Sequence, residues 1–74
     1  MDLNTYGDDH PNVATMRNNL GTEYGSLGQY YKAIEYLELA LATFRKALPS
    51  NHPYIETVQN NLDSTKSAQR ANSL

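Results

Sequence analysis

The sequence predicts an all-α fold, and three observations support this prediction. Apolar residues recur at spacings of three and four between positions 34 and 48, which is the period of an α-helix, at Ile34, Leu37, Leu41, Phe44 and Leu48. Gly and Pro divide the 74 residues into three long segments with no internal Pro. No segment alternates apolar and polar residues for long, as a half-buried strand would. We therefore expect three helices, at about residues 10–26, 29–47 and 53–70, and a frayed tail at 71–74.

The ends of these helices carry recognisable signals. Asp9 and Asn51 are expected to be the N-caps of the first and third helices, because their side-chain oxygens can accept from unpaired backbone N–H groups. A Pro follows each of them inside the first turn, where it removes no helical hydrogen bond. Gly28 lies between the first two helices, where a tight turn needs a residue that adopts positive φ.

Composition limits the function classes that the chain can serve. The formal net charge is −2 and the six Lys and Arg residues are scattered, so we expect neither nucleic acid nor membrane as a partner. No apolar run approaches the roughly 20 residues of a membrane span, and no secretory signal is visible. The chain has no Cys, which excludes disulfides and permits a reducing compartment. We expect a cytoplasmic location.

The chain contains a near-duplicate phrase, and this internal repeat indicates a copied structural unit. Residues 9–20 read DHPNVATMRNNL and residues 51–62 read NHPYIETVQNNL, an offset of 42. His, Pro, Thr, two Asn and Leu are identical in the two copies. The chain is thus expected to hold one complete helix–turn–helix unit and the first helix of the next.

From Ala14 to Leu41 the sequence resembles a tetratricopeptide repeat. The matching residues are Asn19, Leu20, Gly21, Tyr24, Gly28, Tyr30, Ala33, Ile34, Tyr36, Ala40 and Leu41. The period of 42 and the phrases DDHPNVAT, NNL and NHP resemble the longer repeat of kinesin light chains, although Arg17, Pro49 and Asn51 depart from that variant. The resemblance implies an α-solenoid fragment of about one and a half repeats, in which a third helix caps one tetratricopeptide-like pair.

This arrangement makes specific packing predictions. Gly21 should let the first helix approach the small Ala33 of the second closely. Four residues should fill the space between these helices: Tyr24, Tyr30, Leu37 and Ala40. The third helix should place Ile55, Val58 and Leu62 on Leu41, Phe44 and Leu48. Its opposite side carries the polar residues Gln59, Asp63 and Lys66, as expected of a helix that ends a solenoid.

The first helix carries an apolar stripe of Val13, Met16 and Leu20 that would face a preceding repeat. An apolar stripe without a neighbour indicates an interaction site. We expect it to mediate a homodimer, either by pairing with the same stripe of a second copy or by exchange of helices between two chains.

The resemblance also implies a concave groove that binds a protein partner, as an extended peptide or a helix. Polar side chains of the first and third helices would line it: Thr15, Asn18, Asn19, Thr22, Ser26, Thr57, Asn60, Asn61 and Ser64. Asn offers donors and an acceptor that can hydrogen-bond a peptide backbone. The alternative is that Asn18 and Asn19 only satisfy neighbouring backbone and turns.

Catalysis and metal binding have little support in the sequence. There is no Cys, and no Ser has the flanking glycines of a nucleophile elbow. His10 and His52 lie one repeat apart and are expected to complete helix starts, not to share a metal. Tyr24, Tyr30 and Tyr36 are expected to be packing residues, and Tyr6, Tyr31 and Tyr54 to lie at the surface or at junctions.

We therefore expect a protein-interaction module that is not an enzyme and binds no cofactor or metal. The alternative function is a structural or self-assembly segment of a longer solenoid, with no separate ligand.

Overall fold

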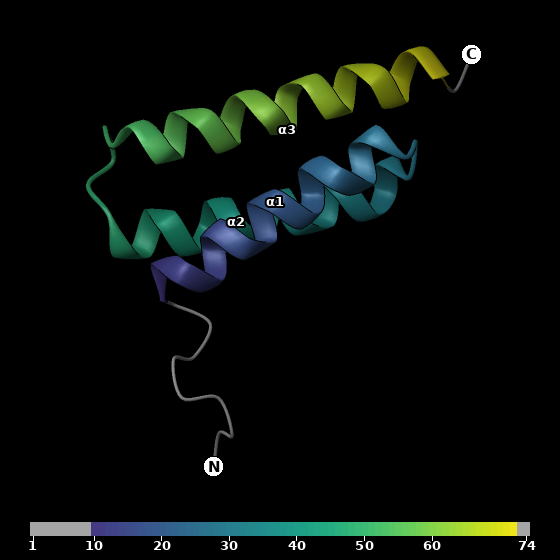
Figure 1. Ribbon diagram of the computed structural model, residues 1–74. Coiled ribbons are helices and arrows are strands. Elements are labelled where there is room, and N and C mark those ends of the chain that lie inside the picture. Colours follow the sequence, from purple (N-terminus) through teal and green to yellow (C-terminus); the bar gives the residue numbers. More distant parts are fainter. Residues whose placement is uncertain (1–9, 73–74) are drawn as a thin grey trace.

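Residues 10–72, the part of the chain that the computed structural model describes, contain three helices (Figure 1). They are α1 (Pro11–Ser26), α2 (Tyr30–Ala47) and α3 (Pro53–Asn72). α1 and α3 run in the same direction and α2 runs opposite to both (Figure 1). Residues 10–72 contain no strand, so the predicted all-α fold is confirmed. None of these helices combines the length and apolar character that crossing a bilayer requires.

The helix boundaries lie within two residues of those predicted. α1 and α2 each begin one residue later, because His10 and Gln29 are their N-caps. α3 continues to Asn72, so the prediction of a frayed tail from residue 71 is wrong for residues 71 and 72. Residues 73 and 74 lie outside the described residues.

Histidine side chains, not Asp or Asn, cap α1 and α3. The His10 Nδ1 atom accepts from the backbone N–H of Asn12 at 3.0 Å, and the His52 Nδ1 atom accepts from that of Tyr54 at 3.0 Å. Proline occupies the first position of each helix, so the cap is the residue just before it. The prediction of Asn51 as a cap is therefore wrong, and Asp9 lies outside the described residues. The expectation that each His completes a helix start is confirmed.

The turn between α1 and α2 depends on Gly28, which has a φ of 84°. Its N–H donates to the Gly25 carbonyl at 3.1 Å, and the Gln29 N–H donates to the Tyr24 carbonyl at 2.9 Å. These two bonds form a Schellman motif, which pairs carbonyls that the end of a helix leaves without partners. Gly28 is thus required by backbone conformation, as predicted.

The three helices share one apolar core, to which α2 contributes most. Its members are Ala14, Leu37, Ala40, Leu41, Phe44, Ile55, Val58 and Leu62, and Ile34 and Leu48 pack against them. Gly21 lets α1 come close to α2: a Cβ there would lie 2.7 Å from Leu37 Cγ and 3.0 Å from the Ala33 carbonyl oxygen. The predicted close approach is confirmed.

Two of the three tyrosines that were predicted to be packing residues, Tyr24 of α1 and Tyr36 of α2, stack on each other. Tyr24 and Tyr36 lie with ring centroids 5.6 Å apart and planes 6° apart, and the Lys32 Nζ atom lies 5.4 Å from the Tyr24 ring centroid. Both rings are only half-buried, as is Tyr30. Tyr31 and Tyr54 are exposed, as expected, and Tyr6 lies outside the described residues.

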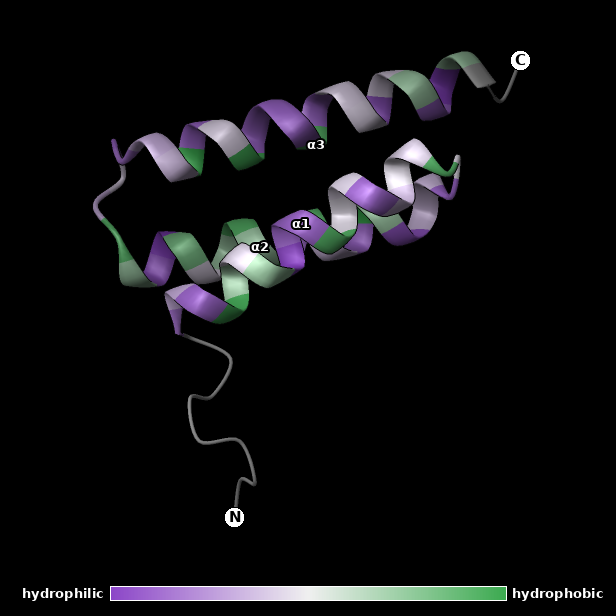
Figure 2. Cartoon of the chain, viewed as in Figure 1, coloured by the Kyte–Doolittle hydropathy of each residue, from purple (hydrophilic) through white to green (hydrophobic). Residues whose placement is uncertain are grey.

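α3 covers the side of α2 that α1 leaves open. Ile55, Val58 and Leu62 are buried in the core with Leu41 and Phe44, and Leu48 lies alongside. The other side of α3 is polar (Figure 2): Gln59 Nε2 donates to Asp63 Oδ1 at 3.1 Å. Lys66 Nζ lies 3.6 Å from Glu38 Oε2 of α2. This is the capping arrangement that the sequence predicts.

Candidate functional site

α1 and α3 border a groove that contains two hollows. The first has a volume of about 300 Å³ and is lined by residues from all three helices, namely Thr15, Asn18, Phe44, Tyr54, Thr57 and Val58. Its aromatic side consists of Phe44 and Tyr54, whose ring centroids lie 5.7 Å apart at an angle of 53°. The His52 and Tyr54 rings also pack edge to face, with centroids 4.6 Å apart and planes 61° apart. This hollow combines an apolar wall with hydroxyl and amide groups.

The second hollow lies nearer the C-terminal ends of α1 and α3, and five of its eight lining residues carry a hydroxyl group. Its volume is about 290 Å³, and its lining is Thr22, Gly25, Ser26, Tyr30, Asn61, Ser64, Thr65 and Ala68. The Thr22 hydroxyl donates to the Asn18 carbonyl at 2.8 Å, and the Thr65 hydroxyl donates to the Asn61 carbonyl at 2.8 Å. These bonds fix both Thr side chains against their own helices.

A hydrogen bond between two asparagines joins α1 to α3 across the groove. Asn61 Nδ2 donates to Asn18 Oδ1 at 3.2 Å, and both side chains are half-buried. Each residue also lines one hollow, Asn18 the first and Asn61 the second. The bridge therefore lies where the two hollows approach each other.

The structure brings most of the predicted groove residues to these hollows. Seven of the nine line one or the other: Thr15, Asn18, Thr22, Ser26, Thr57, Asn61 and Ser64. Asn19 and Asn60 are exposed and line neither hollow. Of each neighbouring Asn pair, only one member faces the groove, because consecutive residues of a helix point about 100° apart.

Several lining residues were not predicted. Phe44 and Val58 were assigned to the core alone, and Tyr54 to the surface or a junction, yet all three line the first hollow. Tyr54 carries no repeat signal, because the corresponding position 42 residues earlier is Asn12. Its place directly after the His-Pro phrase, in the first turn of a helix that faces the groove, was the available clue.

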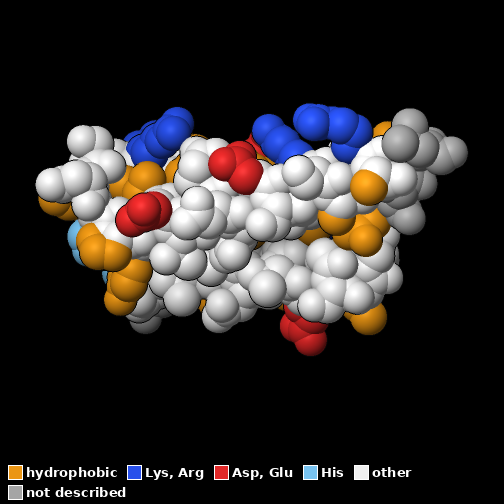
Figure 3. Space-filling view, turned by 90° about the horizontal axis from the view of Figure 1, so that it is seen from above, with side chains coloured by type: hydrophobic (Ala, Val, Ile, Leu, Met, Phe, Trp, Pro, Cys, Tyr) orange, Lys and Arg blue, Asp and Glu red, His pale blue; other side chains and the backbone are white. Residues whose placement is uncertain are grey.

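Neither hollow is lined by an Asp, Glu, Lys or Arg side chain. Viewed from above, Lys and Arg gather along one edge of the molecule, and uncharged side chains cover much of the remaining face (Figure 3). No group of three or more His, Cys, Asp or Glu side chains in residues 10–72 is arranged to hold a metal ion. The groove offers uncharged hydrogen-bonding groups and aromatic surface.

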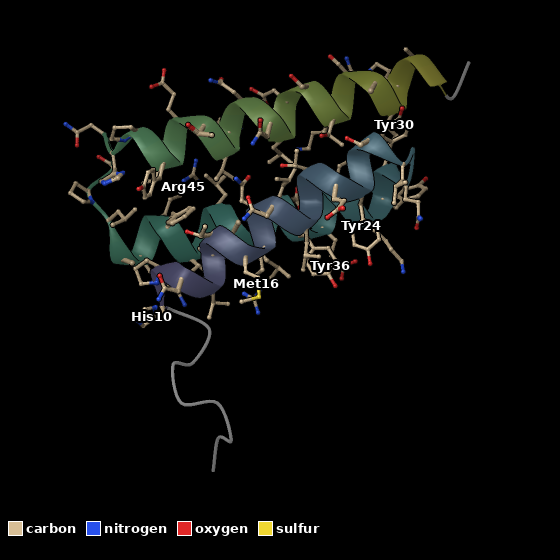
Figure 4. All side chains as sticks on the ribbon, in the orientation of Figure 1. His10, Met16, Tyr24, Tyr30, Tyr36 and Arg45 are labelled. Carbon is tan, nitrogen blue, oxygen red and sulfur yellow. The ribbon has the colours of Figure 1, made fainter. Side chains whose placement is uncertain are left out.

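The predicted self-association stripe lies on another side of α1. Met16 is 60% exposed and Leu20 37% exposed, whereas Val13 is half-buried. Figure 4 shows Met16 on the side of α1 that is turned away from α3. Leu20 also lines a third hollow of about 210 Å³ with Glu23, Tyr24 and Leu27. The stripe and the groove are therefore separate surfaces.

Comparison with known proteins adds one finding. The family model described as Tetratricopeptide repeat matches residues 13–54, more than half of the chain. No curated protein and no solved structure matches the chain. The helix pair α1–α2 and the close approach at Gly21 agree with that match. The resemblance to the kinesin-light-chain variant stays a prediction. The chain belongs to the tetratricopeptide repeat family.

Proposed function

We propose that this chain is a protein-interaction module that binds an extended peptide in the groove between α1 and α3. Tetratricopeptide repeats in general mediate protein–protein interaction. The observation that carries the proposal is the Asn18–Asn61 bridge between two uncharged hollows. A helix is the alternative occupant of the same groove.

The bridge leaves hydrogen-bonding capacity on both amides. Asn18 uses its oxygen in the bridge and keeps its amide N–H groups, and Asn61 keeps its oxygen as an acceptor. A peptide unit presents one carbonyl acceptor and one N–H donor, which is the complementary set. Such contacts recognise a backbone without depending on its side chains.

The proposal includes no catalytic role and no cofactor. The tetratricopeptide repeat is a non-enzymatic family. The chain has two histidines, and each of them caps a helix through its Nδ1 atom: His10 and His52. The cytoplasmic location expected from the sequence belongs to the same proposal.

Replacing Asn61 by Ala tests the groove directly. We expect Asn61→Ala to weaken peptide binding by about twofold to twelvefold, because it removes a backbone partner worth about 0.5–1.5 kcal/mol. The measurement is a peptide-array screen with unbiased sequences, followed by solution titration of the peptides that bind.

Asn60→Ala is the matched control, because Asn60 is the adjacent residue on the same helix and lines neither hollow. Binding that is unchanged in Asn61→Ala, or reduced equally in both variants, would remove the bridge from the account.

A second candidate function is self-assembly through the stripe of Val13, Met16 and Leu20. The specific observation is that the repeat equivalents of these residues, Ile55, Val58 and Leu62, are buried against α2. The same pattern on α1 has no helix over it among the described residues. In a homodimer, a second copy of the chain would cover this stripe. In a longer solenoid, the preceding repeat would cover it.

A further inference from the structure

We propose that the groove selects an uncharged, extended peptide with three defined positions: an apolar or aromatic side chain, a small residue two positions away, and Ser or Thr four positions away. This inference rests on the proposed peptide-binding function and names the ligand class of that site. It follows from the chemistry of each hollow and from the distance between them.

The first hollow suits an apolar side chain. Phe44 and Val58 provide apolar surface at its base, and both are almost completely buried. Tyr54 is 55% exposed and forms a wall that a ligand ring can contact. A closed cavity of about 150 Å³ can hold benzene, so the 300 Å³ of this open hollow accommodates a Phe or Leu side chain.

The second hollow suits a hydroxyl group. Five hydroxyl side chains line it: Thr22, Ser26, Tyr30, Ser64 and Thr65. The donor hydrogens of Thr22 and Thr65 are engaged with backbone carbonyls, which leaves their oxygens as acceptors. A ligand Ser or Thr can donate to these oxygens. A charged side chain would enter a hollow lined by no residue of opposite charge.

The separation of the hollows sets the spacing on the ligand. Thr57 lines the first hollow and Thr65, eight positions further along α3, lines the second. Eight helical residues span roughly 12 Å. An extended peptide advances about 3.3 Å per residue and points alternate side chains to one face, so residues four apart lie roughly 13 Å apart on the same face.

The residue between these two positions faces the Asn18–Asn61 bridge. The bridge spans the groove where the hollows approach each other, so this residue must be small for the peptide backbone to reach the two amides. Gly, Ala or Ser meets that requirement. The predicted pattern is therefore apolar, any, small, any, Ser or Thr, in either chain direction.

The test uses labelled synthetic peptides and the full chain. The parent peptide is Gly-Ala-Phe-Ala-Gly-Ala-Thr-Ala-Gly, in which Thr is the single hydroxyl residue. One comparison peptide has the same composition but places Phe and Thr three positions apart, and another carries Glu in place of the central Gly. We expect the parent to bind at least about fivefold more tightly than either, because each comparison peptide loses one of the matched contacts.

Protein variants assign each preference to its hollow. Tyr54→Ala should reduce the preference for Phe over Ala at the first position and leave the preference for Thr over Val unchanged. Ser64→Ala should do the reverse. Both residues are exposed, so we expect the fold to be retained, which circular dichroism checks. The crossed comparison isolates each contact.

The outcomes separate this inference from the proposed function. Equal affinity for all spacings overturns the inference. So does a preference for apolar and hydroxyl residues seven or eight positions apart, which indicates a helical ligand. If unbiased library peptides bind and Asn61→Ala weakens them without this pattern, the proposed function stands and the inference fails. If no peptide from the library binds, both fail.

Discussion

Single residues determine where the helices begin and how closely they approach. The sequence predicted the starts of α1 and α3 to within one residue. At α3, however, it assigned the N-cap one position before the residue that caps the helix. Asp and Asn are the statistically preferred caps, whereas Pro53 at the first helical position makes His52 the cap. The role of Gly21, by contrast, was predictable from the sequence. The resemblance to the repeat family implies a close approach of two helices at this residue, and the structure confirms it.

Adding one methyl group at Gly21 tests that approach. We expect Gly21→Ala to destabilise the fold by up to about 2 kcal/mol, because overpacking costs about 1–3 kcal/mol and the gain in helix propensity returns about 1 kcal/mol. The new Cβ would overlap with Leu37 Cγ, which belongs to a fully buried side chain. Urea unfolding followed by circular dichroism gives the free energy of unfolding.

Gly25→Ala is the control for this substitution. A Cβ at Gly25 would lie 3.8 Å from both Ala33 Cβ and Thr65 Oγ1, which is ordinary contact. We expect it to leave stability unchanged or to raise it by up to about 1 kcal/mol. Equal destabilisation by both variants would contradict the close-approach account.

At the scale of elements, α1 and α3 carry the same sequence pattern in different surroundings. Leu20 and Leu62 are repeat equivalents, yet Leu20 is 37% exposed and Leu62 is 3% exposed. The sequence predicted which apolar residues of α3 face α2. It did not predict where α3 ends: Ala68, Gln69, Arg70 and Ala71 favour helix, and no Gly or Pro follows to end it.

This difference in burial predicts unequal effects of the same substitution. Leu62→Ala should lower the free energy of unfolding by about 2–5 kcal/mol, since it leaves a cavity between α3 and α2. Leu20→Ala should lower it by less than about 1 kcal/mol, because Leu20 is more than one-third exposed. Thermal unfolding measures the loss of stability in both variants. A low micromolar protein concentration keeps the contribution of self-association small. Similar losses would show that α1 and α3 are equally covered.

At the scale of the whole molecule, the candidate site depends on how α1 and α3 are rotated toward each other. The repeat pairs Asn18 with Asn60 and Asn19 with Asn61 in sequence, whereas the structure pairs Asn18 with Asn61 in space. That contact joins residues from different repeat positions, so no alignment of the two phrases could predict it. The residue types of the groove were predictable; the bridge and its two hollows were not.

The stripe on α1 makes a separate prediction about assembly. We expect the average mass of the chain to rise with concentration and Met16→Glu to keep it monomeric, because a charge at the centre of an apolar contact is left unpaired. Light scattering at tens of micromolar concentration measures this. Asn19→Glu, on an exposed part of α1 outside the stripe, is the control. A wild-type chain that stays monomeric across this range would exclude self-association.

The most direct test of the account is a two-dimensional ¹H–¹⁵N NMR titration of the full chain with a peptide that binds it. The side-chain amides of Asn18 and Asn61 are reporters at the centre of the groove, and those of Asn19 and Asn60 are reporters outside it. We predict that the peptide shifts the first two resonances and leaves the second two unchanged. Shifts confined to Asn19, Asn60 or the stripe of Val13, Met16 and Leu20 would contradict peptide binding between α1 and α3.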